Sequence, residues 1–257
     1  MERFICDNVY VPLRSGPTHK SEMLSQILFG ERYTITDSSG SWTKIRNEFD
    51  NFCGWIDSGH IRHLPDDSDS CGHVLNRTLV CHKEDKTRLV LEPGCEIFNP
   101  DFEEKTFTAG KTIFRASQEF NMKFIATDDK LQDIAMRFIN SPYIWGGRVP
   151  SGIDCSGLTQ LAFKIAGIKI PRDAADQACE GTLVSFLEEA LAGDLVFFGD
   201  DRITHVGMLI SRGLVIHASG RVRIDQIDHQ GIFKREINGY SHTLRTIRRI
   251  PAVRQER

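Results

Sequence analysis

The sequence predicts an α+β fold for its carboxyl-terminal half, residues 127–257, on two observations. Apolar residues recur at helical spacing over residues 130–141 and again over 155–167, where Gly167 is placed to end the second helix. Strand-like runs follow from residue 194 onward, with the sequences DLVFFG, HVGMLI, LVIHAS and LRTIRRI. Helices followed by a series of antiparallel strands are typical of α+β domains, so we look for the chemistry in this half.

The amino-terminal half consists of short strand-like segments separated by turns. Residues 1–65 contain VYVPL, YTITD, WTKIR and CGWID, with SSGS and NEFDN between them. Strands this short and this closely spaced are typical of a small barrel. Residues 73–125 have the same character without a strict sequence repeat, so we predict a second barrel there. The polar and acidic residues 66–72 are then the linker between the two.

Composition and charge argue against several classes of function. The chain has 257 residues and a formal net charge of −3, so we expect no nucleic-acid-binding surface. No apolar run approaches the roughly 20 residues of a membrane span, and the first residues lack the pattern of an export signal. Seven cysteines without regular spacing favour free thiols in a reducing compartment. We therefore expect a cytoplasmic protein, unless a signal peptide was removed from this sequence.

Cys155 is the candidate nucleophile, because it lies at the start of the second predicted helix, after the glycine-rich segment YIWGGRVPSGID. A thiolate there would face the positive end of the helix dipole and unpaired N–H groups, so we expect a lowered thiol pKa. The N–H of Cys155 could also stabilise an oxyanion. A buried and inert thiol is the alternative, and for Cys155 taken alone it is the better interpretation.

Two histidines downstream are the candidate bases. His205 begins the apolar run HVGMLI, and His217 follows in LVIHASG. Two strands joined by a tight turn would bring these positions side by side, so that His205 accepts the thiol proton and His217 orients its imidazole. A single histidine in a strand is more often structural. A pair at hairpin spacing, downstream of a cysteine at a helix start, favours the catalytic interpretation.

Six motifs of the carboxyl-terminal half, in this order, resemble the NlpC-type cell-wall peptidases. They are YIWGG (143–147), DCSGL (154–158), PRDAADQ (171–177), GDLVFF (193–198), HVGM (205–208) and VIHASG (215–220). The amino-terminal segments VPLRSGPTHKSEMLSQILFGERY, SWTKI and CGWID resemble the bacterial SH3-like barrel of one branch of that family. The resemblance therefore implies a papain-like catalytic domain preceded by one or two SH3-like barrels.

The resemblance also implies a reaction. Enzymes of this branch cut the bond between γ-D-glutamate and a diamino acid, meso-diaminopimelate or lysine, in murein peptides with a free N-terminal L-alanine. It implies Cys155 as nucleophile, His205 as base and His217 as orienting residue, in agreement with the spacing. Tyr143 matches a family tyrosine beside the oxyanion site, although packing under the glycine turn explains it equally well. No cofactor is expected.

Charged groups of the substrate need partners, and the resemblance implies which residues these are. Burying the free ammonium unpaired would be costly, and Asp173 matches the family aspartate that pairs with it. Asp154 and Ser156 match positions that shape the D-glutamate pocket. Arg172 is the cation expected to meet a carboxylate, with a structural ion pair to Asp173 or Asp176 as an equal alternative.

The first barrel is expected to complete the amine site through an acidic residue. Glu31 and Glu22 are the candidates, although a solvated surface charge is the better interpretation of either. Two departures from the family affect the same site. Ala174 stands where the family often has serine, and Phe52 stands where it often has tyrosine, so hydroxyl groups that could contact the substrate are absent. Selectivity for a free N-terminus is therefore the weaker part of the prediction.

Two other classes of function stay open. In one, the barrels bind the cell wall and the last domain has lost its activity, which an intact nucleophile and base argue against. In the other, the same thiol catalyses acyl transfer or amide hydrolysis on another substrate. No metal site is predicted, because the pairs Cys71–His73 and Cys81–His82 lack the spacing of structural zinc ligands. The sequence does not determine the oligomeric state.

Overall fold

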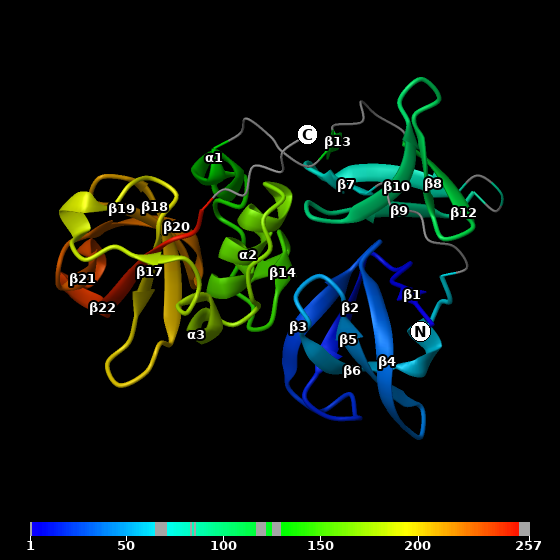
Figure 1. The fold of residues 1–257 in the computed structure, drawn as a ribbon, viewed down its shortest axis with the longest axis horizontal. Helices are drawn as coiled ribbons and strands as arrows, with labels where there is room; N and C mark the ends of the chain where they lie inside the picture. The colour runs from blue at the N-terminus through cyan, green and yellow to red at the C-terminus, as the bar shows by residue number, and fades with distance from the viewer. Residues whose placement is uncertain are drawn as a thin grey trace. The chain divides into compact units, whose positions relative to one another are not determined.

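The computed structural model describes residues 2–64, 71–82, 84, 86–116, 122–124 and 130–251, drawn as a ribbon in Figure 1. The chain forms two compact units, Met1–Ile125 and Ala126–Arg257. Most of the predicted linker, residues 66–70, lies outside the described residues. No helix within the described ranges is long and apolar enough to cross a membrane.

The amino-terminal unit begins with a six-stranded antiparallel sheet of order β1-β4-β5-β6-β2-β3. Its strands are β1 (Phe4–Ile5), β2 (Tyr10–Arg14), β3 (Met23–Leu28), β4 (Arg32–Ser39), β5 (Trp42–Asn47) and β6 (Cys53–Asp57), followed by the 3-10 turn η1 (Ser58–His60). Side chains alternate between the two faces of a strand, so Val11 and Leu13 of β2 enter the core while Tyr10 is exposed. Ile27 and Ile45 belong to the same core cluster.

A second antiparallel sheet follows in the same unit, with the order β13-β7-β10-β11-β12-β8-β9. Its strands are β7 (Cys71–Val74), β8 (Thr78–His82), β9 (Arg88–Leu91), β10 (Glu96–Asp101), β11 (Thr106–Ala109), β12 (Thr112–Ala116) and β13 (Met122–Phe124). Phe98, Phe107 and Phe114 are buried, and the rings of Phe107 and Phe114 stack with 5.3 Å between their centroids. Large aromatic side chains of this kind dominate the energetics of a small core.

Three helices open the carboxyl-terminal unit: α1 (Leu131–Met136), α2 (Cys155–Ile165) and α3 (Ala174–Gln177). The predicted end at Gly167 is confirmed, since α2 stops just before Gly167, whose φ is +80°. The first helix is shorter than the predicted 130–141. After Met136 the N–H of Phe138 donates to the carbonyl of Ala135, three residues back, so the chain tightens into turns.

A seven-stranded antiparallel sheet forms the rest of this unit, with the order β16-β22-β17-β18-β19-β20-β21 and a further pairing of β21 with β22. Its strands are β16 (Thr182–Leu183), β17 (Leu195–Phe198), β18 (His205–Ser211), β19 (Leu214–Ser219), β20 (Arg221–Ile227), β21 (Gly231–Lys234) and β22 (Gly239–Arg249). Shorter elements are β14 (Arg148–Val149), β15 (Gly152–Ile153), η2 (Leu187–Glu189) and η3 (Arg235–Ile237).

Helix α2 lies against this sheet, as Figure 1 shows for the green helix beside the yellow and orange strands. All eleven residues of α2 are buried, and the helix packs on β18 and β19. The α+β prediction is confirmed. Strands β20 and β21 were not predicted, and β20 contributes a carboxylate to the site described next.

Candidate active site

The start of α2 is fixed by Asp154, which caps the helix. Its Oδ1 accepts a hydrogen bond from the N–H of Gly157 at 2.7 Å, and its Oδ2 accepts one from the N–H of Gly146 at 2.8 Å. A side chain at Gly157 is excluded, because a Cβ there would lie 2.4 Å from the carbonyl oxygen of Gly147. The cap therefore places Cys155 as the first residue of a buried helix.

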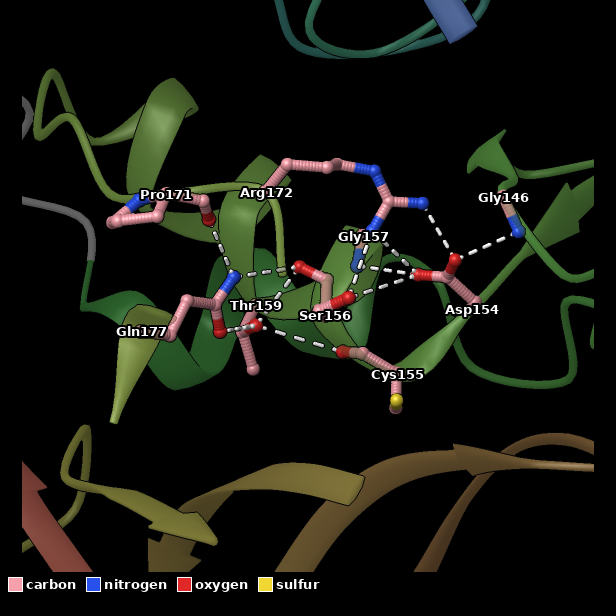
Figure 2. A network of polar contacts seen from close by, with 9 residues as sticks. All are labelled: Gly146, Asp154, Cys155, Ser156, Gly157, Thr159, Pro171, Arg172 and Gln177. Atoms are coloured by element: carbon pink, nitrogen blue, oxygen red, sulfur yellow. Dashed lines mark hydrogen bonds and ion pairs between the residues drawn. The ribbon is translucent and has the colours of Figure 1, made fainter. Parts of the chain in front are cut away.

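The guanidinium of Arg172 binds the carboxylate of Asp154, the residue that caps the helix (Figure 2). Its guanidinium donates to both carboxylate oxygens of Asp154, at 3.0 and 2.5 Å, and to the Oγ of Ser156 at 2.7 Å. The side chains of Arg172 and Asp154 are only 1% and 7% exposed. The expectation that Arg172 meets a substrate carboxylate is corrected here, because the guanidinium is engaged with Asp154 inside the domain. The structural ion pair that this guanidinium forms is with Asp154.

A second set of hydrogen bonds joins α3 to α2 behind the nucleophile. Thr159 donates to the side-chain carbonyl of Gln177 at 2.8 Å. The amide nitrogen of Gln177 donates to the backbone carbonyls of Ser156 at 3.1 Å and of Pro171 at 2.8 Å. Figure 2 shows the polar groups of Asp154, Ser156, Thr159 and Gln177 joined in one network. Since it is buried and internally satisfied, this network holds the helix start rigidly.

The sulfur of Cys155 points away from that network, toward the strands (Figure 2). Burial, and after it the negative charge of Asp154, raise the pKa of the Cys155 thiol to about 11. The backbone N–H groups of Val206 and Ser156 and the charge of Arg172 act in the opposite direction. The expected lowered thiol pKa is therefore wrong for the substrate-free protein, because burial outweighs the helix start. Cys155 rests as a neutral thiol and needs a base.

Three adjacent strands supply a chain of polar side chains. In the β18–β19 pair Gly207 lies opposite His217, and in the β19–β20 pair Val215 lies opposite Asp225. His205 shares a face with Gly207, which lacks a side chain, so the ring of His217 reaches His205 diagonally. His205 Nε2 lies 2.8 Å from His217 Nδ1, and His217 Nε2 lies 3.0 Å from an oxygen of Asp225. The predicted juxtaposition of the two histidines is thus present.

The hydrogen-bond chain assigns the tautomers. The carboxylate of Asp225 can only accept, so His217 carries its proton on Nε2 and accepts from His205 through Nδ1. His205 then carries its proton on Nε2, which leaves its Nδ1 as the free base. Burial lowers the pKa of His205, and that of His217 in spite of the bond to Asp225. Both rings are therefore neutral at neutral pH, and His205 can accept a proton.

Tyr143 lies beside this chain. A pocket of about 310 Å³ is lined by Tyr143, His205, Ser219 and His242 among others. Burial raises the pKa of Tyr143 to about 12, and the neighbouring Cys155 contributes in the same direction, so the hydroxyl stays protonated as a donor. The resulting site holds a thiol, a base and a hydroxyl donor in one domain, the set that nucleophilic acyl chemistry needs.

The remaining predicted residues lie apart from this set or have other contacts. Asp173 is exposed at the start of α3. Glu31 is fully buried in the amino-terminal unit, where its Oε2 accepts from the N–H of Leu28 at 2.8 Å. The interpretation of Glu31 as a solvated surface charge is therefore wrong. Glu22, the other candidate, is exposed. Phe52 packs against the core cluster of the first sheet.

Sequence reasoning missed two residues of the site, Asp225 and His242. Asp225 is a buried carboxylate in the alternating strand RVRIDQI, a pattern that could have drawn attention to it. His242 stacks on His205 and carried no signal in the sequence. No group of three His, Cys, Asp or Glu side chains among the described residues is arranged to hold a metal ion.

Two parts of the chain match known families. Residues 140–240 match the NlpC/P60 family, and residues 13–61 match the bacterial dipeptidyl-peptidase Sh3 domain. The chain therefore carries an NlpC/P60 domain, the catalytic domain of a cysteine peptidase, with a bacterial dipeptidyl-peptidase Sh3 domain ahead of it.

Relatives with established names match over most of the chain. A γ-D-glutamyl-L-lysine dipeptidyl-peptidase of Bacillus subtilis is 27% identical over 80% of this chain and 75% of its own length. Dipeptidyl-peptidase 6 of Lysinibacillus sphaericus is 26% identical over 85% of this chain and 89% of its own length. The crystal structure of an NlpC/P60 family protein from Bacillus cereus superposes with a TM-score of 0.81 over 96% of this chain and 99% of that one, at 21% identity. The predicted fold, papain-like with SH3-like barrels, is therefore confirmed.

Proposed function

We propose that this peptidase hydrolyses the bond between γ-D-glutamate and the diamino acid in murein peptides that begin with a free L-alanine. The observation that carries the proposal is the chain of His205, His217 and Asp225 in the same domain as a thiol at a helix start. The names of relatives that match over most of the chain support the substrate, and those names favour lysine as the diamino acid.

The reaction follows from the assigned protons. Nδ1 of His205 accepts the proton of Cys155, and the thiolate attacks the γ-carbonyl carbon of D-glutamate. The N–H of Cys155, which has no acceptor within the described part of the chain, and the Tyr143 hydroxyl donate to the oxyanion. His205 then protonates the leaving amine of the diamino acid. Water hydrolyses the thioester and releases L-alanyl-D-glutamate.

Recognition of the peptide rests on charge. Asp173 presents an exposed carboxylate one residue after Arg172, and we assign it to the free ammonium of L-alanine. Asp154 and Ser156 contribute to the D-glutamate pocket through the backbone that they hold rather than through free side chains. The pocket beside His205 receives the leaving diamino acid, because His205 protonates that group.

Incubation with L-Ala-γ-D-Glu-L-Lys, followed by mass spectrometry, tests the reaction. We expect release of L-Ala-D-Glu by the native protein and none by the Cys155→Ala variant. Intact peptide with the native protein, or equal release by Cys155→Ala, would contradict the proposal.

N-acetylation of the peptide tests the amine site and should lower kcat/KM strongly. Asp173→Asn should do the same for the free peptide, whereas Asp176→Asn, an exposed aspartate of the same helix, should not.

Asp225→Asn is expected to lower kcat/KM about 10- to 100-fold, by analogy with the loss of hydrogen-bond partners of metal-ligating histidines. The neutral amide no longer favours the His217 tautomer that accepts from His205, so the base is less well oriented. Steady-state kinetics checks this expectation. Asp133→Asn, at an exposed carboxylate of α1, is the control. Equal activity of Asp225→Asn and Asp133→Asn would show that the carboxylate does not orient the histidines.

A further inference from the structure

His242 lies on β22 and contacts the ring of the base, His205, through its face. The rings of His205 and His242 are stacked, with 4.2 Å between their centroids and 28° between their planes. His217 instead meets His205 edge-on, at 5.0 Å and 85°. His205 is thus held by one histidine through its edge and by another through its face. The hydrogen bond to His217 limits rotation in one direction, and the stacked ring limits tilting out of that plane.

The backbone at this point of β22 is built to present His242. Ile232 lies opposite His242 and Phe233 lies opposite Tyr240, so Ser241 is an extra residue in the strand. Such a bulge turns the neighbouring side chains, and bulges are frequent beside active sites. Gly231, with φ +142°, permits the close approach, because a Cβ there would lie 1.8 Å from the carbonyl oxygen of His242.

The His242 ring is fixed and uncharged. Its Nδ1 lies 2.8 Å from the Oγ of Ser241. Burial, followed by the nearby His217 and Lys234, lowers the pKa of His242 to about 4, while Asp225 acts in the opposite direction. With His205 itself, these are titratable groups that face His242 from β18, β19, β20 and β21. Asp200, Asp201 and Arg202, in the loop before β18, line a pocket together with His242. Because His242 is neutral at pH 7, it presents an aromatic face rather than a second positive charge to His205.

This geometry matters at one step of the reaction. When His205 accepts the thiol proton, an imidazolium forms in a buried site, where an unpaired charge is costly. A neutral aromatic ring against the face of a cation stabilises it. We propose that His242 is a positioning residue, which holds the ring plane of His205 and stabilises its imidazolium form. The inference concerns the thiol–imidazole pair and does not depend on which peptide is cut.

Alkylation of Cys155 by iodoacetamide, followed across pH by peptide mapping, tests the inference without any peptide substrate. The pH midpoint of alkylation reports how readily the thiol gives up its proton to His205. Loss of the stacked ring in His242→Ala should raise that midpoint by about half a unit to one unit. His242→Phe keeps a ring of similar size and should leave the midpoint near the native value. His229→Ala, at an exposed histidine of the same domain, is the matched control.

Two results would overturn the inference: an unchanged midpoint in a folded His242→Ala, or a shift in His242→Phe as large as in His242→Ala. The thermal unfolding midpoint shows whether each variant is folded. If His242→Ala does not fold, His242→Phe still tests the inference, because it preserves the packing. With the proposed peptide, His242→Ala should lower kcat about three- to tenfold and leave KM unchanged. Failure of the native protein to cleave that peptide would refute the proposed function and leave the alkylation test intact.

Discussion

Replacing His205 with asparagine is expected to lower kcat by about three to four orders of magnitude while leaving KM close to the native value. The Cys155 thiol has a pKa of about 11, so almost no thiolate exists at neutral pH unless a base removes the proton. Asparagine cannot accept that proton. The measurement is steady-state cleavage of L-Ala-γ-D-Glu-L-Lys by the variant and by His229→Asn, at an exposed histidine of the same domain.

The size of the loss of kcat in His205→Asn shows whether His205, rather than His217 or His242, is the base. His217 and His242 contact His205, and either ring could be suggested as the proton acceptor instead. His217 Nδ1 is occupied by the bond from His205, and His242 is directed at Ser241. A loss smaller than about tenfold in His205→Asn would therefore contradict the assignment of His205 as the base, since general-base catalysis is worth at least a hundredfold.

Arg172→Met is expected to destabilise the catalytic domain by about 3 to 5 kcal/mol, the usual cost of removing one partner from a buried ion pair. The carboxylate of Asp154 would stay buried with two N–H donors but without its bidentate cation. Because the same carboxylate caps α2, the position of Cys155 should suffer as well. Urea unfolding measures the loss, with Arg221→Met, at an exposed arginine of the same domain, as the control.

A second variant separates the buried charge from other effects of losing Arg172. In Arg172→Met combined with Asp154→Asn no charge is left unpaired, and the side-chain oxygen of the asparagine can still accept the helix-cap hydrogen bond from Gly157. We expect the double variant to be more stable than Arg172→Met alone. If it is equally or less stable, the ion pair is not what holds the helix start.

Local patterns in the sequence were sufficient to predict where Cys155, His205 and His217 lie in the fold. The helical spacing after Cys155 depends on residues within eleven positions, and α2 spans Cys155–Ile165 as expected. The spacing of His205 and His217 depends on one hairpin, which the β18–β19 register reproduces. Both signals are short in range, which is why they can be recognised without a structure.

The pKa of Cys155 and the partner of Arg172 could not be predicted in the same way. The thiol pKa is decided by how deeply the helix start is buried, and the packing of α2 on β18 and β19 determines that burial. Asp173 is the neighbour of Arg172 in sequence, yet the ion-pair partner of Arg172 is Asp154, which comes from a different loop. The positions of Asp225 and His242 depend on the register of β20 and on the bulge at Ser241, which no local pattern specifies.

Capture of the covalent intermediate tests the central claim most directly. The native protein is mixed with L-Ala-γ-D-Glu-L-Lys, quenched in acid within the first turnover, digested and mapped by mass spectrometry. We predict an L-alanyl-γ-D-glutamyl group in thioester linkage on the peptide that contains Cys155, with free lysine as the first product. Release of L-Ala-D-Glu without any adduct on Cys155, and with undiminished rate in Cys155→Ala, would contradict the account.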